Sequence, residues 1–170
     1  MVESVFSVDG VLARADPHYQ PREGQLAMAQ AVAHAMGAGE VLVAEAGTGV
    51  GKTYAYLVPA LLSGERVLLS TATKALQDQL FSRDIPRLVQ ALEVPVRVAL
   101  LKGRSSYLCL HRLGMARHAV GGESPQQIRV LAKIEEWSRS TRSGDLSELT
   151  GLDDRSPVIP WVTSTRENCL

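Results

Sequence analysis

Apolar residues recur with two different spacings along the first hundred residues. Helical spacing begins after Pro21 and ends near Gly39, and a second apolar stretch with helical character covers Gly51–Leu62. Short apolar runs stand on either side of this second stretch, at Val41–Ala44 and Arg66–Ser70. We therefore predict helix, buried strand, helix and buried strand, in that order.

The same alternation of elements continues to about residue 101. Thr73–Leu92 has helical spacing, and we predict a break at Pro86 because proline cannot donate a backbone hydrogen bond. Segment 94–101 alternates between apolar and polar residues and then becomes wholly apolar, which predicts a third strand. Strands separated by helices indicate an α/β fold, with a parallel sheet and helices on both of its faces.

The chain changes character after Lys102. Segment 94–122 carries five basic residues, two histidines and no acid, whereas acids prevail from Glu123 onward. Ser124, Pro125 and Gln127 form the pattern of a capping box, so one more helix is predicted to begin there. We place a boundary between residues 103 and 104, and we predict no regular structure beyond Ser138.

Composition excludes several classes of protein. Eighteen basic and eighteen acidic residues cancel, so bulk positive charge does not hold nucleic acid here. No apolar run approaches the ~20 residues of a membrane span, and the first ten residues do not resemble a secretory signal. We expect a cytoplasmic protein with no membrane partner. The two cysteines do not indicate a disulfide scaffold.

The candidate chemistry is concentrated in a glycine-rich loop between the first predicted strand and the second predicted helix. The loop has the ending of a phosphate-binding P-loop and consists of Ala46, Gly47, Thr48, Gly49, Val50, Gly51, Lys52 and Thr53. Its glycines let backbone N–H groups surround phosphate oxygens at a helix N-terminus. Lys52 can reach the outer phosphates and the Thr53 hydroxyl can bind Mg²⁺. The alternative, a merely flexible glycine loop, lacks this strand-and-helix context.

The wider string Glu45–Thr53 resembles motif I of superfamily 2 helicases, in particular the XPD-like branch that includes the bacterial DinG proteins. Arg22 and Gln25 match the Q motif of that family, in which a glutamine amide recognises adenine. Ser70–Leu80 resembles motif Ia, which implies that the hydroxyls of Thr71 and Thr73 contact the phosphates of single-stranded DNA.

Segment 102–109 resembles the entry into the iron-sulphur domain of the same family. The resemblance implies that Cys109 and Cys169 are two of the four cysteine ligands of a [4Fe-4S] cluster. Each cysteine also has a simpler interpretation, as a buried apolar thiol and an exposed terminal thiol respectively. The basic stretch makes Lys102, Arg104 and Tyr107 candidate DNA contacts, with the Tyr107 ring able to stack on a base. A solvated basic face is the alternative.

The resemblance implies an incomplete RecA-like P-loop NTPase sheet in residues 1–103 and the start of a mainly helical iron-sulphur domain in residues 104–170. It also implies a parent enzyme that couples ATP hydrolysis to movement along single-stranded DNA and to the unwinding of forked DNA. No Asp-Glu-x-His box follows the loop. We therefore expect an N-terminal fragment that binds ATP and Mg²⁺ but is not catalytically competent alone.

Two other functions remain open from the sequence. The chain fits a nucleotide- or DNA-binding module without turnover, since the catalytic base is missing. It also fits a P-loop kinase of a small molecule, for which the matches at Gln25 and at Ser70–Leu80 would be coincidence.

Overall fold

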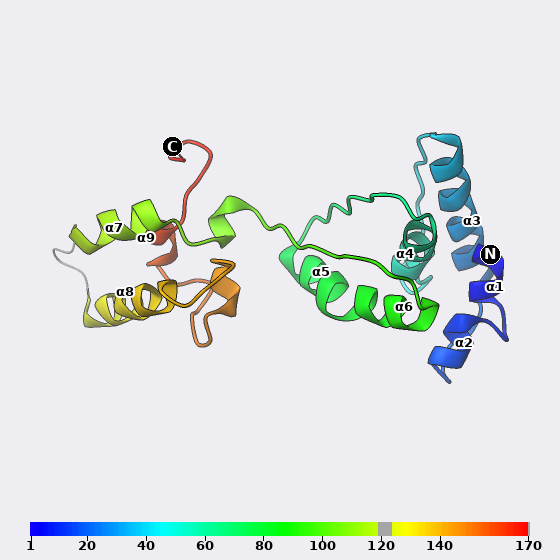
Figure 1. Cartoon of the computed structure of the whole chain (residues 1–170), viewed down its shortest axis with the longest axis horizontal. Coiled ribbons are helices and arrows are strands. Elements are labelled where there is room, and N and C mark those ends of the chain that lie inside the picture. Colours follow the sequence, from blue (N-terminus) through cyan, green and yellow to red (C-terminus); the bar gives the residue numbers. More distant parts are fainter. Residues whose placement is uncertain (119–123, 170) are drawn as a thin grey trace. The chain divides into compact units, whose positions relative to one another are not determined.

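The computed structural model describes residues 1–118 and 124–169, which form two compact units, Met1–Leu100 and Leu101–Leu170. Figure 1 shows both units built from helices and connecting segments. No helix among the described residues combines the length and the apolar character that crossing a membrane requires. The assignment of residues 1–103 and 104–170 to a motor domain and a cluster domain stays a prediction.

The first unit is an assembly of helices around one apolar core. Its elements are α1 (Val2–Phe6), α2 (Val11–Ala15), α3 (Glu23–Ala38), α4 (Lys52–Leu62), α5 (Lys74–Gln79), the π-helical turn η1 (Leu80–Asp84) and α6 (Ile85–Leu92). Helix α3 packs along α4, and the core includes the fully buried Ala29 of α3 and Ala55 of α4. The helices predicted after Pro21 and over Gly51–Leu62 are confirmed.

Helices α5 and α6 are joined into one helical segment by η1. The N–H of Ile85 bonds to the carbonyl of Leu80, five residues earlier, which widens the turn just before Pro86. The helix predicted over Thr73–Leu92 is therefore present, and the irregularity comes a turn earlier than predicted. Pro86 itself fits into the first turn of α6, where its missing N–H costs little.

The three predicted strands are not strands in this structure. Val41–Ala44, Arg66–Ser70 and segment 94–101 have no strand assignment, and the only β-bridge in the described part of the chain joins Tyr107 to Asp145. No backbone hydrogen bond joins one of the three segments to another. Because a strand exists only through hydrogen bonds to a neighbouring strand, apolar sequence alone did not produce a sheet. The predicted parallel sheet is not confirmed.

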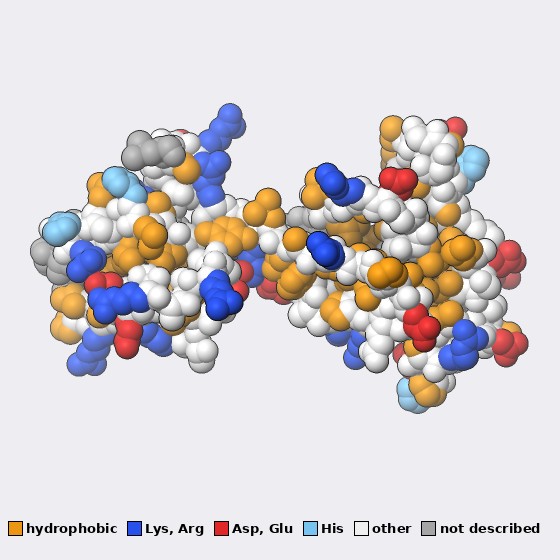
Figure 2. Space-filling view, viewed as in Figure 1, with side chains coloured by type: hydrophobic (Ala, Val, Ile, Leu, Met, Phe, Trp, Pro, Cys, Tyr) orange, Lys and Arg blue, Asp and Glu red, His pale blue; other side chains and the backbone are white. Residues whose placement is uncertain are grey.

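These three segments leave apolar side chains in solvent. Val41, Val43 and Leu68 are each more than nine-tenths exposed, at 94%, 93% and 93%. Figure 2 shows apolar side chains at the surface of this unit, beside charged ones. Helices α3, α4 and α6 bury their apolar faces against one another, whereas the connecting segments have nothing to pack against.

The second unit has its own small core. Its elements are η2 (Arg104–Ser106), α7 (Leu110–His118), α8 (Pro125–Ser138), η3 (Leu146–Glu148) and α9 (Ile159–Val162). Ile134, Val158 and Val162 are fully buried in the core between these elements. The capping box predicted at Ser124 is confirmed. The short elements η3 and α9 lie where no regular structure was predicted, because neither is long enough to show a periodicity in the sequence.

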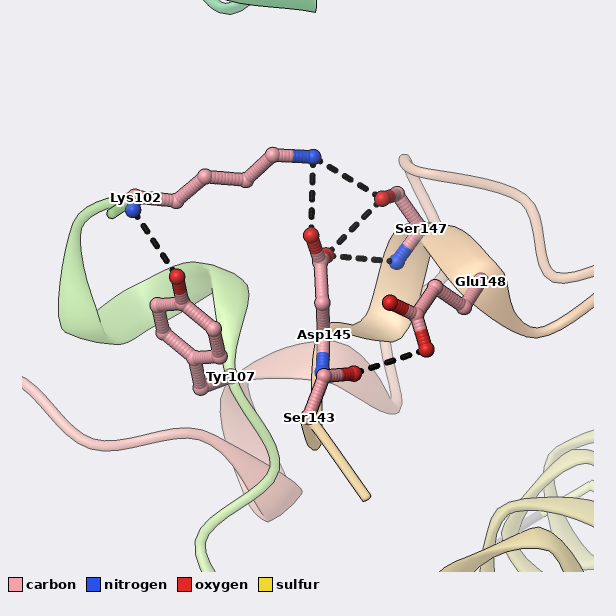
Figure 3. A network of polar contacts seen from close by, with 6 residues as sticks. All are labelled: Lys102, Tyr107, Ser143, Asp145, Ser147 and Glu148. Carbon is pink, nitrogen blue, oxygen red and sulfur yellow. Dashed lines mark hydrogen bonds and ion pairs between the residues drawn. The ribbon is translucent and has the colours of Figure 1, made fainter. Parts of the chain in front are cut away.

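A buried ion pair ties the start of the second unit to its later loop. The Nζ of Lys102 lies 2.9 Å from Oδ2 of Asp145, and both side chains are almost fully buried. Lys102 also donates to the hydroxyl of Ser147, which in turn donates to Asp145 (Figure 3). Burial raises the pKa of Asp145, but the hydrogen bonds from Lys102 and Ser147 outweigh it, so the pKa of this carboxyl lies below its ordinary value.

Replacing Asp145 with asparagine is expected to destabilise the second unit by about 3 kcal/mol at neutral pH, because the buried Lys102 ammonium would lose the carboxylate that lies 2.9 Å from it. Both tryptophans, Trp137 and Trp161, lie in this unit, so tryptophan fluorescence during urea unfolding measures its stability alone. The matched control is Glu148→Gln, which changes an exposed carboxylate in the same turn. Equal stability of the two variants would contradict the role assigned to the pair.

The same pair gives the second unit an acid-sensitive stability. Because the pKa of Asp145 is lower in the folded chain, the unfolded chain takes up the proton first as pH falls. The stabilisation is therefore complete at neutral pH, begins to fall below about pH 5 and is lost as pH falls through the folded pKa. The difference in unfolding free energy between the original chain and Asp145→Asn should shrink over this range.

Candidate nucleotide-binding site

The glycine-rich loop ends directly at the N-terminus of α4, as the sequence predicted. Gly49 and Gly51 have φ angles of +81° and +87°, in the left-handed region that favours glycine. Gly51 is the N-cap residue of α4, and no side chain caps that end of the helix. The first backbone N–H groups of an 11-residue helix are thus without a side-chain partner, which suits an anionic ligand.

Lys52 spans the loop from the inside. Its ammonium donates to the carbonyl oxygens of Ala46 and Gly47, at 2.8 and 2.7 Å. These two residues begin the loop, so the lysine closes it across its width. Neutral carbonyls are weaker partners for an ammonium group than phosphate oxygens are. We therefore expect the Lys52 ammonium to exchange these carbonyls for the outer phosphates when a nucleotide binds.

Residues at the start of α3 hold the other end of the loop. The Nε2 of Gln25 donates to the carbonyl of Gly51 at 2.9 Å, and Gln25 is almost fully buried. Arg22 donates to the carbonyl of Gly49, and the Tyr19 hydroxyl donates to Oε1 of Gln25 at 3.4 Å. The structure thus brings Arg22 and Gln25, about twenty residues away in sequence, into direct contact with the loop.

A recess of ≈ 350 Å³ opens beside this contact. Side chains that line it include those of Tyr19, Gln25, Thr53, Arg83 and Arg87, from four different segments of the first unit. Its volume lies within the range of small-molecule sites. Sequence reasoning missed Tyr19, Arg83 and Arg87, and the only signal for the two arginines was their spacing of four residues on one helical face.

Thr53 lies in the first turn of α4, half-buried at the edge of the recess. Burial raises the pKa of the neighbouring Tyr56. A hydrogen bond with Thr53 lowers this pKa and the negative charge of Asp84 raises it, so the net shift is upward. Tyr56 is thus a neutral phenol at physiological pH.

The candidate DNA contacts fall into both units. In the first unit, Thr73 caps α5 by accepting from the N–H of Leu76, and the Thr71 hydroxyl donates to the carbonyl of Thr73. In the second unit, the Tyr107 hydroxyl accepts from the backbone N–H of Lys102, and Arg104 is exposed. Lys102 is the exception among these candidates, since its ammonium is buried against Asp145 and not presented at the surface.

The two cysteines occupy different environments in the second unit. Cys109 is half-buried just before α7, and its N–H donates to the carbonyl of Val162 at 2.7 Å. Cys169 is exposed, and neither thiol is part of a disulfide. Among the described residues no three metal-ligating side chains gather at one place.

Gly51 is the position where the loop tolerates least change. A Cβ added there would lie 2.1 Å from Nε2 of Gln25, and the φ angle is already unfavourable for alanine. We expect Gly51→Ala to weaken ATP binding at least tenfold. An alanine in the left-handed conformation costs about 1 to 2 kcal/mol by itself, and the clash with Gln25 should make the loss of stability of the first unit larger than that. Calorimetric titration with ATP and a circular-dichroism melt measure the two effects.

The chain offers a matched control for this prediction. Gly64 has a similar φ angle of +71° and no atom within 4 Å of an added Cβ, so Gly64→Ala carries the backbone strain without the clash. Adding Gln25→Ala to Gly51→Ala should recover part of the lost stability by removing the clashing amide. The close contact would have no consequence if Gly51→Ala and Gly64→Ala behaved alike.

Comparison of the sequence with known proteins assigns the chain to a family. A family model described as DEAD/DEAH box helicase matches residues 26–139. The chain is 51% identical over 97% of its length to the ATP-dependent DNA helicase YoaA of Escherichia coli strain K12, and 46% identical over 99% to YoaA of Haemophilus influenzae strain Rd. It is 44% identical over 88% of its length to the ATP-dependent helicase DinG of Mycobacterium tuberculosis strain H37Rv.

The chain spans about a quarter of the length of these relatives, at 26% of each. The predicted resemblance to the DinG and XPD-like helicases is confirmed, and the chain belongs to the DEAD/DEAH box helicase family.

Proposed function

We propose that this chain is the nucleotide-binding part of an ATP-dependent DNA helicase. The names of its relatives, an ATP-dependent DNA helicase and an ATP-dependent helicase, support this proposal. The whole protein would couple ATP hydrolysis to movement along single-stranded DNA and to the unwinding of forked DNA. The observation that carries the proposal is the contact of Gln25 with Gly51, because it joins a base-recognising amide and a phosphate-binding loop into one site.

ATP and Mg²⁺ fit the residues at the start of α4. Backbone N–H groups of Gly49, Gly51 and the first helical turn surround the inner phosphates, and Lys52 leaves the carbonyls of Ala46 and Gly47 to bind the outer ones. The Thr53 hydroxyl supplies one ligand to Mg²⁺, and phosphate oxygens supply others. When bound, the ion offsets the negative charge that develops on the transferred phosphoryl group.

Membership of the family implies a P-loop NTPase fold. We propose further that Val41–Ala44, Arg66–Ser70 and segment 94–101 are strands of an incomplete parallel sheet, which helices cover on both faces. The support is that their exposed apolar side chains are what a sheet would bury, and that no backbone hydrogen bond yet joins one of these segments to another. On this proposal residues 1–103 belong to the first motor domain.

Residues 104–170 are proposed to begin a mainly helical iron-sulphur domain. Cys109 and Cys169 would be two ligands of a [4Fe-4S] cluster, which is held by four thiolates. The donor set of this chain fits half of that requirement, and the relatives are long enough to supply the rest. The thiolates would hold the cluster, and a bound cluster would in turn link the segments that carry Cys109 and Cys169.

Contacts with single-stranded DNA are proposed at two places. Thr71 and Thr73 stand at the start of α5, where hydroxyl and backbone N–H groups suit phosphates. In the second unit Arg104 and Tyr107 provide a cation and an aromatic ring. The Lys102 ammonium is committed to Asp145 and Ser147, so its contribution is to hold this segment in shape.

Lys52→Ala is expected to abolish ATP hydrolysis by the full-length protein and to leave the fold intact, because the side chain makes hydrogen bonds only to loop carbonyls. Phosphate release measures hydrolysis, and a circular-dichroism melt measures the fold. Lys74→Ala, which changes an exposed lysine outside the loop, serves as the control for nucleotide binding. Unchanged turnover in Lys52→Ala would contradict the role assigned to this residue.

A helicase and a small-molecule kinase are separated by their response to DNA. Added single-stranded DNA should raise ATP hydrolysis by the full-length protein severalfold if Thr71 and Thr73 face a DNA strand. Thr71→Val combined with Thr73→Val should reduce this stimulation more than the hydrolysis seen without DNA. Hydrolysis that is indifferent to DNA would favour the kinase.

A further inference from the structure

The recess beside the loop lies at the side where the nucleoside of a bound nucleotide would emerge. Lys52, which serves the outer phosphates, points toward Ala46 and Gly47 at the start of the loop. The recess is lined instead by Gly51, Thr53 and Tyr54, at the opposite end of the loop, and by Gln25. Its volume of ≈ 350 Å³ accommodates a base and a ribose, which the narrow loop does not.

Arg83, from η1, is one of the residues that line this recess. Its Nε donates to Oδ1 of Asp84 at 2.9 Å, and its side chain is about half exposed, at 54%. The Nη groups of Arg83 have no hydrogen-bond partner in the described part of the chain. A guanidinium group that is fixed at Nε and open at both Nη groups is ready to donate two hydrogen bonds or to stack on a flat ring.

Asp84 is itself held in place. Its Oδ2 accepts from Nε2 of Gln79 at 2.7 Å, and only 5% of its side chain is exposed. The carboxylate thus has one fixed oxygen toward Gln79 and one toward Arg83. Arg83 and Asp84 belong to the π-helical turn η1, whose wider spacing is often found at functional sites. Arg87, four residues on, lines the same recess without a carboxylate to orient it.

We propose that Arg83 binds the nucleoside part of the nucleotide, and that Asp84 and Gln79 are positioning residues that fix its guanidinium group. This inference rests on the proposed binding of ATP at the loop. Tyr19 and Gln25, which line the same recess, would contact the base, and Arg83 would contact the base or the ribose. The segment after motif Ia thereby takes part in nucleotide recognition as well as in the proposed DNA contact.

The test compares two ligands that share the phosphates and differ in the nucleoside. ATP and inorganic tripolyphosphate are titrated calorimetrically into the 170-residue chain and into Arg83→Ala. We expect Arg83→Ala to weaken ATP binding about tenfold and to leave tripolyphosphate binding unchanged. Arg66→Ala removes an exposed arginine of the same unit outside the recess, and it should bind both ligands as the original chain does.

Asp84→Asn keeps the shape of the positioning residue and removes its charge. It should weaken ATP binding less than Arg83→Ala, again without an effect on tripolyphosphate, whereas a general structural defect would weaken both ligands together. The proposal is overturned if Arg83→Ala binds ATP normally or loses both ligands equally. An original chain that binds neither ligand would instead refute the proposed nucleotide site itself, and the inference with it.

Discussion

The structure of the candidate site depends on one close approach, that of the Gln25 amide to the backbone of Gly51. Only a residue without a Cβ leaves room for the amide, and only a residue tolerant of positive φ turns the chain into α4 at this point. The packing of α3 along α4 provides the rigid support, since Ala29 and Ala55 are fully buried in the core they share. The loop, the Gln25 amide and the core are therefore parts of one arrangement.

This arrangement explains why the loop is held in place although the described residues form no sheet. P-loops are usually described as strand, loop and helix, and here the strand segment Val41–Ala44 is unpaired and exposed. Arg22, Gln25 and Lys52 nevertheless bond to four of the loop carbonyls, at Ala46, Gly47, Gly49 and Gly51. These side chains hold the loop in place by binding its carbonyl oxygens. The backbone N–H groups of the loop are left available to a ligand.

The second unit follows a different principle, in which charge inside a small core fixes a loop. Lys102 and Asp145 lie 43 residues apart in sequence and pair in a nearly buried position, close to the bridge between Tyr107 and Asp145. A buried ion pair gains little energy over an apolar contact, but it accepts only one geometry. The pair therefore fixes the position of the segment that leads to Cys109 within the unit. This position would orient the thiol in its proposed role as a cluster ligand.

The sequence by itself determined the local features of this protein. Glycine positions, the Ser124 capping box and helical spacing revealed the loop, α3, α4 and α8, because each depends on residues within a few positions of one another. The tertiary structure alone decided the rest. The unpaired segments, the burial of Lys102 and the meeting of Tyr19, Gln25 and Arg83 around one recess depend on contacts between distant residues, and neither periodicity nor motif spacing carries that information.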